Sequence, residues 1–367
     1  MKTLKSLYMG ENPVNFPKLW KKAFICSIIV LAMGIGSFGF RGLNLGLDFE
    51  GGTSYEVRAA EVTVSDTREV LATVGASDSR VQKVGTDIIR IRSDIDNPQK
   101  AGELRELLEN QIGEVETFEQ VGPTWGSDVT DKATKALLVF FVVVALYLTI
   151  RLEWKMALGA LVAVIHDIII SVGVYSIFQF EITPATVVAF LTIMGYSLYD
   201  TIVVYDKVRE IIGRLGATEK YSYTEMMNLA LNRVAMRSVN TSISSALPVL
   251  SLLIIGSLIM GATTLQEFSV ALLVGIIVGS YSSIFLAASL VALLKERESR
   301  WEQVRKRLEQ KGINTSSIRR IDRKEALKPL ETKKTERIEG VRGPARGGAA
   351  SVQRPGSIAP RPRKKRR

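Results

Sequence analysis

Apolar residues gather in six long runs along the chain, separated by polar stretches. A helix needs about 20 apolar residues to cross the hydrocarbon core of a bilayer, with a range of about 17–25. All six runs are long enough, and six of them in one chain argue against buried helices of a soluble domain. We therefore predict six transmembrane helices. Their runs are Ala23–Phe40, Ala133–Ile150, Met156–Phe178, Ala185–Val204, Val239–Met260 and Phe268–Leu294.

Lys and Arg residues lie in alternate connections between these runs. They precede the first run and occur in the second–third and fourth–fifth connections, whereas residues 179–184 and 261–267 contain none. Cytoplasmic loops of membrane proteins carry the excess of Lys and Arg. Both chain ends are therefore predicted to be cytoplasmic, and the long segment after the first run to be outside. The first run is long for the core of a signal peptide, so we interpret it as a retained anchor.

This pattern divides the chain into five parts. They are a cytoplasmic N-terminus at 1–22, a first transmembrane helix at 23–40, an extracytoplasmic domain at 41–131, transmembrane helices two to six within 132–294 with a cytoplasmic loop at 206–237, and a cytoplasmic tail at 295–367. Within the loop, Ser222 and Glu225 have the spacing of a capping box, which predicts a short amphipathic helix. After residue 340 the tail is rich in Gly, Pro and Arg, a composition that predicts disorder.

The outer segment shows short alternating and amphipathic stretches instead of a long apolar run. In chain order these predict a strand at 53–58, a helix at 65–74, a strand at 81–84, a turn at 85–87, a strand at 88–92, a helix at 99–112 and a strand at 117–121. Ser65 and Asp66 are candidate caps of the first helix. The βαββαβ order is that of the ferredoxin-like unit. The expected fold is a polytopic α-helical membrane protein with a small extracytoplasmic α/β domain.

The composition excludes several classes of site. The 367 residues include one Cys and one His. One Cys excludes a disulfide framework within the chain, and one His excludes a His-rich zinc site. No G-x-x-x-x-G-K-[ST] motif occurs. We therefore expect no metal, no cofactor and no enzymatic activity, and an electrochemical gradient is the remaining energy source.

Charge is segregated along the chain, although the formal net charge is +11. Residues 41–131 contain 18 Asp and Glu against 9 Lys and Arg, whereas residues 295–367 contain 24 Lys and Arg against 9 Asp and Glu. This contrast indicates that the two segments face different compartments. The basic tail has three interpretations: binding to anionic lipid, binding to the ribosome, or a solvated segment that only fixes topology.

Two titratable residues lie side by side near the middle of the third run. A charge at mid-membrane costs about 2.5–3.5 kcal/mol on insertion scales, so it needs a reason. Because His166 and Asp167 are adjacent on a helix, we expect their side chains to point in different directions. Both are candidates for a proton pathway, since imidazole and carboxylate exchange protons. A structural pair satisfied by neighbouring helices is the alternative.

Asp200 and Arg237 are sharper candidates for proton passage. Asp200 lies near the cytoplasmic end of the fourth run, and Arg237 opens the fifth at a matching depth. An Asp–Arg pair there would be broken by protonation, which makes it a two-state element. A structural Asp200 and a simple headgroup anchor at Arg237 are the alternatives. Small-residue stripes for helix packing are predicted at Gly34, Gly36, Gly275, Gly279 and Ser283.

A glycine-containing stretch directly after the first run supports a family resemblance. The sequence from Leu45 to Thr53, which contains Asp48, Phe49, Gly51 and Gly52, resembles the motif that opens the outer domain in the SecD/SecF family of protein-export subunits. This family belongs to the resistance–nodulation–division superfamily. Stretches that resemble its SecF branch are 151–154 with His166-Asp167, 195–206, and 232–242. The resemblance covers about residues 41–294.

The resemblance implies a module that pairs with SecD in the prokaryotic plasma membrane. It also implies use of the proton motive force to promote late preprotein translocation through SecYEG, with YajC-type and YidC-type subunits as further partners. The family's membrane Asp and Arg fall on Asp200 and Arg237, and Tyr199 replaces its usual Asn. Two other functions stay open, a small-molecule or lipid exporter and a non-transporting translocon scaffold. The coupling ion stays open between proton and sodium.

Overall fold

The computed structural model describes residues 14–84, 87–259, 262–313, 319 and 321. All of them belong to one compact unit, residues 1–328. Four predictions lie at least partly outside the described residues: the N-terminal segment at 1–22, the turn at 85–87, the end of the fifth run at Met260, and the cytoplasmic tail with its disordered part after residue 340.

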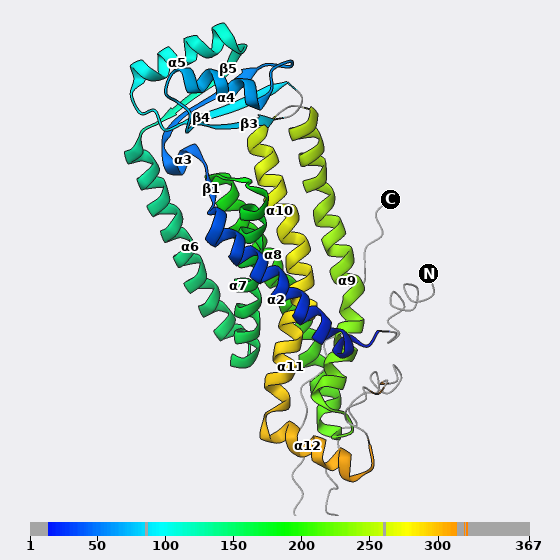
Figure 1. Cartoon of the computed structure of the whole chain (residues 1–367). Helices are drawn as coiled ribbons and strands as arrows, with labels where there is room; N and C mark the ends of the chain where they lie inside the picture. The colour runs from blue at the N-terminus through cyan, green and yellow to red at the C-terminus, as the bar shows by residue number, and fades with distance from the viewer. Residues whose placement is uncertain (1–13, 85–86, 260–261, 314–318, 320, 322–367) are drawn as a thin grey trace, which may run out of the picture. The chain divides into compact units, whose positions relative to one another are not determined.

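Six helices in the described part of the chain are long and apolar enough to cross a membrane, as the sequence predicted. They correspond to α2 (Phe16–Arg41), α6 (Pro123–Arg151), α7 (Trp154–Phe178), α8 (Pro184–Leu215), α9 (Tyr223–Ser251) and α10 (Thr263–Ser282), drawn in Figure 1. A π-helical segment, Leu252–Ile259, continues α9, and another, Ser283–Ala287, joins α10 to α11 (Ala288–Glu296).

Several helices extend beyond their apolar runs because polar residues continue them outside the bilayer. The fourth runs on to Leu215 and is followed by a short 3₁₀ turn, Gly216–Thr218. The capping box of Ser222 and Glu225 is present, but it opens α9 itself. The predicted capped helix in this connection is therefore present, but its predicted short length was wrong, because the helix continues into the fifth span.

The α/β domain has the predicted βαββαβ order. Its elements are β2 (Gly52–Arg58), α4 (Val64–Thr73), β3 (Arg80–Val84), β4 (Ile88–Ser93), α5 (Pro98–Gln111) and β5 (Glu114–Val121). The antiparallel sheet has the order β3-β4-β2-β5, and its core includes Tyr55, Ile89, Ile91 and Leu108. Thr63 caps α4, while Asp66 reaches back to the Thr63 backbone; the predicted caps were misplaced because Thr63 opens the helix earlier.

A compact junction joins this domain to the membrane helices. The short strand β1 (Asn44–Leu45) pairs in parallel with β6 (Glu181–Ile182), which lies between α7 and α8. After β1 comes α3 (Leu47–Glu50), and then Gly51 and Gly52 with φ of 79° and 103°. A Cβ added at Gly52 would lie 2.5 Å from the Ser93 carbonyl oxygen, so this position requires glycine for both space and conformation.

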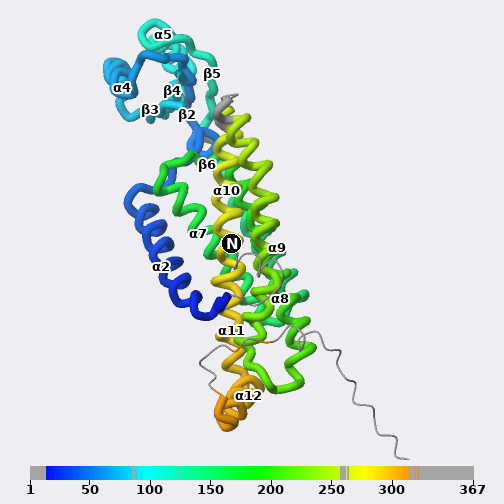
Figure 2. The backbone as a smooth tube through the Cα atoms, turned by 90° about the vertical axis from the view of Figure 1, so that its right-hand side faces the viewer, coloured from blue at the N-terminus to red at the C-terminus, as the bar shows by residue number. Residues whose placement is uncertain are grey.

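Small residues bring the membrane helices close together. A Cβ added at Gly275 would lie 2.1 Å from Ile193 Cγ2, and one at Gly279 would lie 2.9 Å from Ser197 Cβ, so α10 packs directly on α8. The Cβ of a residue at Gly34 would approach Gly173, where α2 crosses α7 (Figure 2). These packing predictions are confirmed. Gly36 differs, because a Cβ there would meet nothing within 4 Å.

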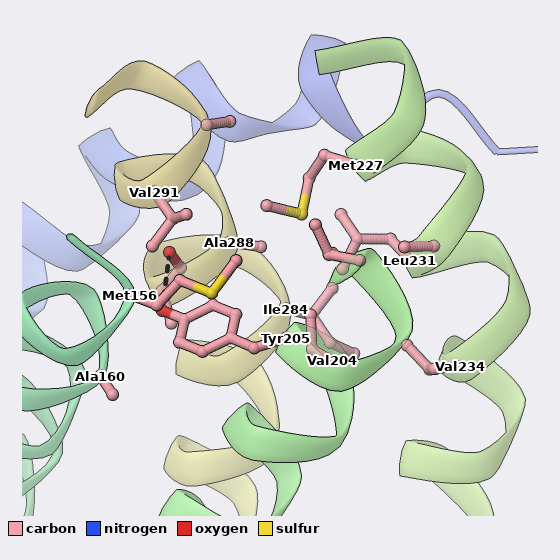
Figure 3. Close-up of a cluster of buried hydrophobic side chains, with 14 of the residues drawn as sticks. Met156, Ala160, Val204, Tyr205, Met227, Leu231, Val234, Ile284, Ala288 and Val291 are labelled. Atoms are coloured by element: carbon pink, nitrogen blue, oxygen red, sulfur yellow. Dashed lines mark hydrogen bonds between the residues drawn. The ribbon is translucent and has the colours of Figure 1, made fainter. Parts of the chain in front are cut away.

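The apolar core of the membrane part extends to the end of the bundle farther from the α/β domain. Figure 3 shows Tyr205 of α8 between Met156 of α7 and Ile284, with its hydroxyl donating to the Ala287 carbonyl at 3.3 Å. The amphipathic helix α12 (Ser299–Gln310) buries Trp301, Val304 and Leu308 in the same core. The start of the tail is thus helical and packed against the bundle.

Candidate functional site

Asp200 lies on the face of α8 that meets α9. Its Oδ1 accepts a hydrogen bond of 2.8 Å from Ser238 Oγ. Its Oδ2 is buried and accepts none from the residues that the structure describes. Ser242 Oγ donates to the Ser238 carbonyl, so the hydroxyls continue along α9. A membrane carboxylate with one satisfied oxygen and one unsatisfied oxygen has room to accept a proton without losing a hydrogen bond.

Arg237 approaches α8 but does not pair directly with Asp200. It is exposed, and its Nη2 donates to the Tyr199 hydroxyl at 3.0 Å. Across the α8–α9 contact, Tyr199 therefore meets Arg237, and Asp200 meets Ser238. The expected closeness of Asp200 and Arg237 in depth agrees with these contacts. The direct ion pair is not formed among the described side chains, because the rotation of α9 turns Ser238 toward the carboxylate.

A small cavity of about 30 Å³ adjoins Asp200, and most of its polar lining is hydroxyl groups. The residues around it come from α8, α9 and α10, namely Tyr196, Ser197, Tyr199, Asp200, Thr241, Ser242, Ser245, Gly275, Ile276, Gly279 and Ser280. Ser242 Oγ and Ser280 Oγ are 2.5 Å apart and link α9 to α10 beside it. The volume and the polar lining suit one or two water molecules. This cavity places the carboxylate of α8 next to α9 and α10.

His166 and Asp167 form a second buried polar cluster in α7. Their side chains are 4% and 2% exposed, and His166 Nδ1 lies 3.0 Å from Asp167 Oδ1. The expectation that they point in different directions was wrong, because both turn into the space between α7 and its neighbours. His166 Nε2 lies 3.2 Å from Ser27 Oγ of α2.

The second oxygen of Asp167 completes this cluster. Its Oδ2 accepts from Ser197 Oγ of α8 at 2.5 Å and from Ser282 Oγ of α10 at 2.8 Å. Four helices, α2, α7, α8 and α10, therefore meet at one histidine–aspartate pair. Each of its polar atoms has a partner, unlike Asp200 Oδ2. Its hydrogen bonds hold α7 to α2, α8 and α10.

The glycine-containing stretch lies in the junction between α2 and the α/β domain. Phe49 packs in an apolar cluster with Ile182, and a Cβ added at Gly126 would lie 2.6 Å from the Phe49 carbonyl oxygen. Asp48 lines an open cavity of about 570 Å³ beneath the polar face of the sheet. These residues shape the junction, and none of them forms a hydrogen bond or ion pair with Asp200 in the described part of the chain.

Sequence reasoning missed an ion-pair cluster at this junction. Arg90 of β4 contacts Glu56, Glu181 and Glu267, and Arg92 contacts Glu181. Burial, followed by the positive charge of Arg90, lowers the pKa of Arg92 to about 10. The alternation at 88–92 was a signal, because it places both arginines on the sheet face opposite the apolar core. Their acidic partners are too distant in sequence to be read from it.

In the part of the chain that the structure describes, no three His, Cys, Asp or Glu residues are grouped so that they could hold a metal ion. Cys26 is exposed and free.

Two family models match the sequence. The model for the C-terminal region of the protein export membrane proteins SecD/SecF matches residues 103–297, and that for the SecD/SecF GG motif matches residues 36–61. The protein translocase subunit SecF of Streptomyces coelicolor is 38% identical over 82% of this chain and 82% of its own length. That of Mycobacterium tuberculosis is 38% identical over 80% of this chain and 70% of its own length.

A solved structure gives the same assignment. The crystal structure of SecDF from Thermus thermophilus, a translocon-associated membrane protein, matches with a TM-score of 0.70 and 32% identity. The match covers 77% of this chain and 39% of that one, so the chain spans about two fifths of the SecDF protein. Sequence motifs, helix arrangement and relatives agree. The chain is therefore a multi-pass membrane protein that belongs to the SecD/SecF family.

Proposed function

We propose that this chain is the SecF-type accessory subunit of the Sec protein-export machinery, and that it uses the proton motive force to promote late preprotein translocation through SecYEG. The observation that carries the proton-driven part is Asp200, whose Oδ2 is buried in a membrane helix without a hydrogen bond from any described group. The relatives are named translocase subunits, and family membership gives the Sec-pathway role.

Protonation of Asp200 changes a contact between two helices. The ionised carboxylate accepts from Ser238 and attracts the positive charge of nearby Arg237, which Tyr199 holds at the edge of the site. A proton on the free oxygen removes that attraction, so the preferred packing of α9 on α8 changes. Protons enter from outside, reach Asp200 and leave to the cytoplasm. The fully hydrogen-bonded His166–Asp167 pair belongs to the same proposed pathway as a second candidate position.

A SecD partner would cover the polar face of α9. An open groove of about 660 Å³ is lined by Arg237, Asn240, Thr241, Ser244 and Ser245, with Tyr196, Pro248 and Val249. Polar groups at membrane depth must meet protein or water, because lipid offers them no hydrogen bonds. The groove also adjoins the Asp200 cavity through Thr241 and Ser245. SecD pairing would therefore enclose the proton site, and YajC-type and YidC-type subunits are further proposed partners.

The proposed location is the prokaryotic plasma membrane with both termini in the cytoplasm. The alternation of basic and uncharged connections supports it. In this orientation the acidic α/β domain faces outward, where an emerging preprotein would contact it. The basic tail lies on the cytoplasmic side, where anionic lipid or the ribosome remains its proposed contact.

The test is export in cells depleted of this protein. They are complemented with the wild type, Asp200→Asn or Asp206→Asn, and conversion of labelled precursor to secreted mature protein is followed at equal membrane levels. Asp206 is a matched control, because it lies on the same helix and its ion pairs with described residues are to exposed Arg151 and Arg209, both at 3.9 Å. We expect the wild type and Asp206→Asn to restore export and Asp200→Asn not to restore it. Equal export by both variants would favour the scaffold alternative, and unaffected export after depletion would refute the Sec assignment.

A further inference from the structure

Arg90 holds three carboxylates with one guanidinium group. Its Nη1 lies 2.9 Å from Glu181 Oε2 and 3.2 Å from Glu267 Oε1. Its Nη2 and Nε lie 2.9 Å and 3.0 Å from Glu56 Oε1. The fixed fork of donors on a guanidinium allows these contacts at the same time, which a single ammonium group does less well.

The three carboxylates belong to three different parts of the molecule. Glu56 lies in β2 of the α/β domain, Glu181 in β6 directly before α8, and Glu267 near the start of α10. Both helices go on to line the Asp200 cavity. From the α/β domain, Arg90 therefore contacts the strand that leads directly into α8 and the start of α10, the two helices that both line the proposed proton site.

These contacts are shielded from solvent. The side chains of Arg90, Glu181 and Glu267 are 11%, 8% and 13% exposed. By comparison, the ion pair between Arg80 and Glu50 at the same junction is 3.6 Å long, with both side chains about half exposed. Removing one partner from a shielded charge network costs far more stability than removing one from a surface ion pair. Arg92 reaches Glu181 and the Leu45 carbonyl; the charge of Glu267 in α10 also acts on Arg92, but the two described side chains form no hydrogen bond or ion pair.

We propose that Arg90 is the positioning residue that couples the α/β domain to α8 and α10, so that a displacement of these helices moves the domain with them. This inference rests on the proposed function for its use, since proton-driven movement at Asp200 is what the coupling transmits. Glu267 makes the link to α10, and Glu181 makes the link to α8. The domain follows the helices because one rigid group joins both to the sheet.

The first test measures the docking of the domain directly. Gln82 of β3 and Gln266 of α10 line one cavity of about 100 Å³ with Arg90, so cysteines at these two positions report the contact. The native Cys26 is exposed and is replaced by serine. Spin labels are attached to the full chain with its SecD partner in membranes. With the native Arg90, we expect one narrow distribution of distances between the two labels. In Arg90→Ala, the ratio of docked to undocked domain should fall at least about tenfold.

Matched variants keep this result interpretable. Arg105→Ala removes an arginine of α5 that, among the described residues, forms an ion pair with exposed Glu109 and stacks on Phe118. This variant should leave the distance distribution unchanged. Arg90→Lys, which keeps the charge, should give an intermediate distribution and also serves if Arg90→Ala does not fold. An unchanged distribution in the Arg90 variants would overturn the proposal.

The second test asks whether the coupling serves export. Arg90→Ala should reduce export, and a short bifunctional cross-linker between the cysteines at 82 and 266 should restore it, because a covalent link replaces the lost contacts. Failure of the cross-link to restore export would overturn the coupling role. The distance measurement does not depend on proton transfer. If Asp200→Asn exported normally, the proposed function would fail while the docking result stood by itself.

Discussion

Replacing Gly275 by alanine places a methyl group inside the contact between α10 and α8. The added Cβ would lie 2.1 Å, 2.3 Å and 2.6 Å from Cγ2, Cδ1 and Cγ1 of Ile193, which is 3% exposed. No real Cβ sits this close to another carbon. All three atoms belong to a β-branched side chain, whose χ1 is held to one strongly preferred rotamer in a helix. A rotamer change at Ile193 is therefore costly, and otherwise the two helices must move apart.

The expected loss of stability follows from two opposing effects. Overpacking a core costs about 1–3 kcal/mol. Alanine is favoured over glycine within a helix by up to about 1 kcal/mol, which offsets part of that cost. We therefore predict that Gly275→Ala lowers the free energy of unfolding by about 1–2 kcal/mol. Export should fall with it, because the same contact positions the Asp200 cavity.

The assay is reversible unfolding of the purified chain in detergent micelles. Gly36→Ala is the control, since its Cβ would meet nothing within 4 Å. A second comparison uses an Ile193→Ala background, where the space for the new methyl group already exists and the cost of Gly275→Ala should largely disappear. Such coupling between contacting residues amounts to about 0.5–3 kcal/mol. Equal stability of Gly275→Ala and Gly36→Ala, or an unchanged cost in the Ile193→Ala background, would refute the packing argument.

Three further predictions concern polar contacts. Asp167→Ala leaves the buried Ser197, Ser282 and His166 without their acceptor, and it should lower the unfolding free energy by about 1–3 kcal/mol per unsatisfied group, more than Asp167→Asn does; equal losses would contradict this. Ser238→Ala removes the hydrogen bond to Asp200 and should reduce export, while Ser238→Thr retains it; unimpaired export by the alanine variant would count against that contact. Burial raises the pKa of Glu298, but hydrogen bonds and charges of Lys295 and Lys155 outweigh it, so the net pKa lies below 4.5. The ionised Glu298 therefore stabilises the folded state, fully above pH 4.5 and less as the pH falls through the folded-state pKa. Glu298→Gln should flatten the acid limb of the plot of unfolding free energy against pH, and an unchanged limb would exclude this contribution.

The order of elements could be predicted because local pattern determines it. Six apolar runs predicted the membrane helices, and the alternation in the second half of 88–92 predicted β4. Element boundaries were harder, because polar residues continue a helix beyond the bilayer as well as end it. At α4, Thr63 and Ser65 are both good caps, and only the folded chain shows that Thr63 opens the helix.

The candidate site was predictable in depth but not in rotation. Position along a helix places Asp200 and Arg237 at similar levels, yet only helix packing decides that Ser238 faces the carboxylate and that Arg237 meets Tyr199. The same limit applies to His166 and Asp167, whose side chains converge because four helices surround them. The Arg90–Glu267 contact joins residues 177 positions apart and has no local signal.

The most direct measurement is the proton dependence of a late translocation step. Inverted membrane vesicles that contain this chain, SecD and SecYEG are loaded with a preprotein that halts in the channel when ATP is removed. A proton motive force is then imposed, and protection of the preprotein from added protease is followed. Completion should occur with the wild type and with Asp206→Asn, and it should stop with Asp200→Asn. Completion by Asp200→Asn at the wild-type rate would contradict proton-driven translocation through Asp200.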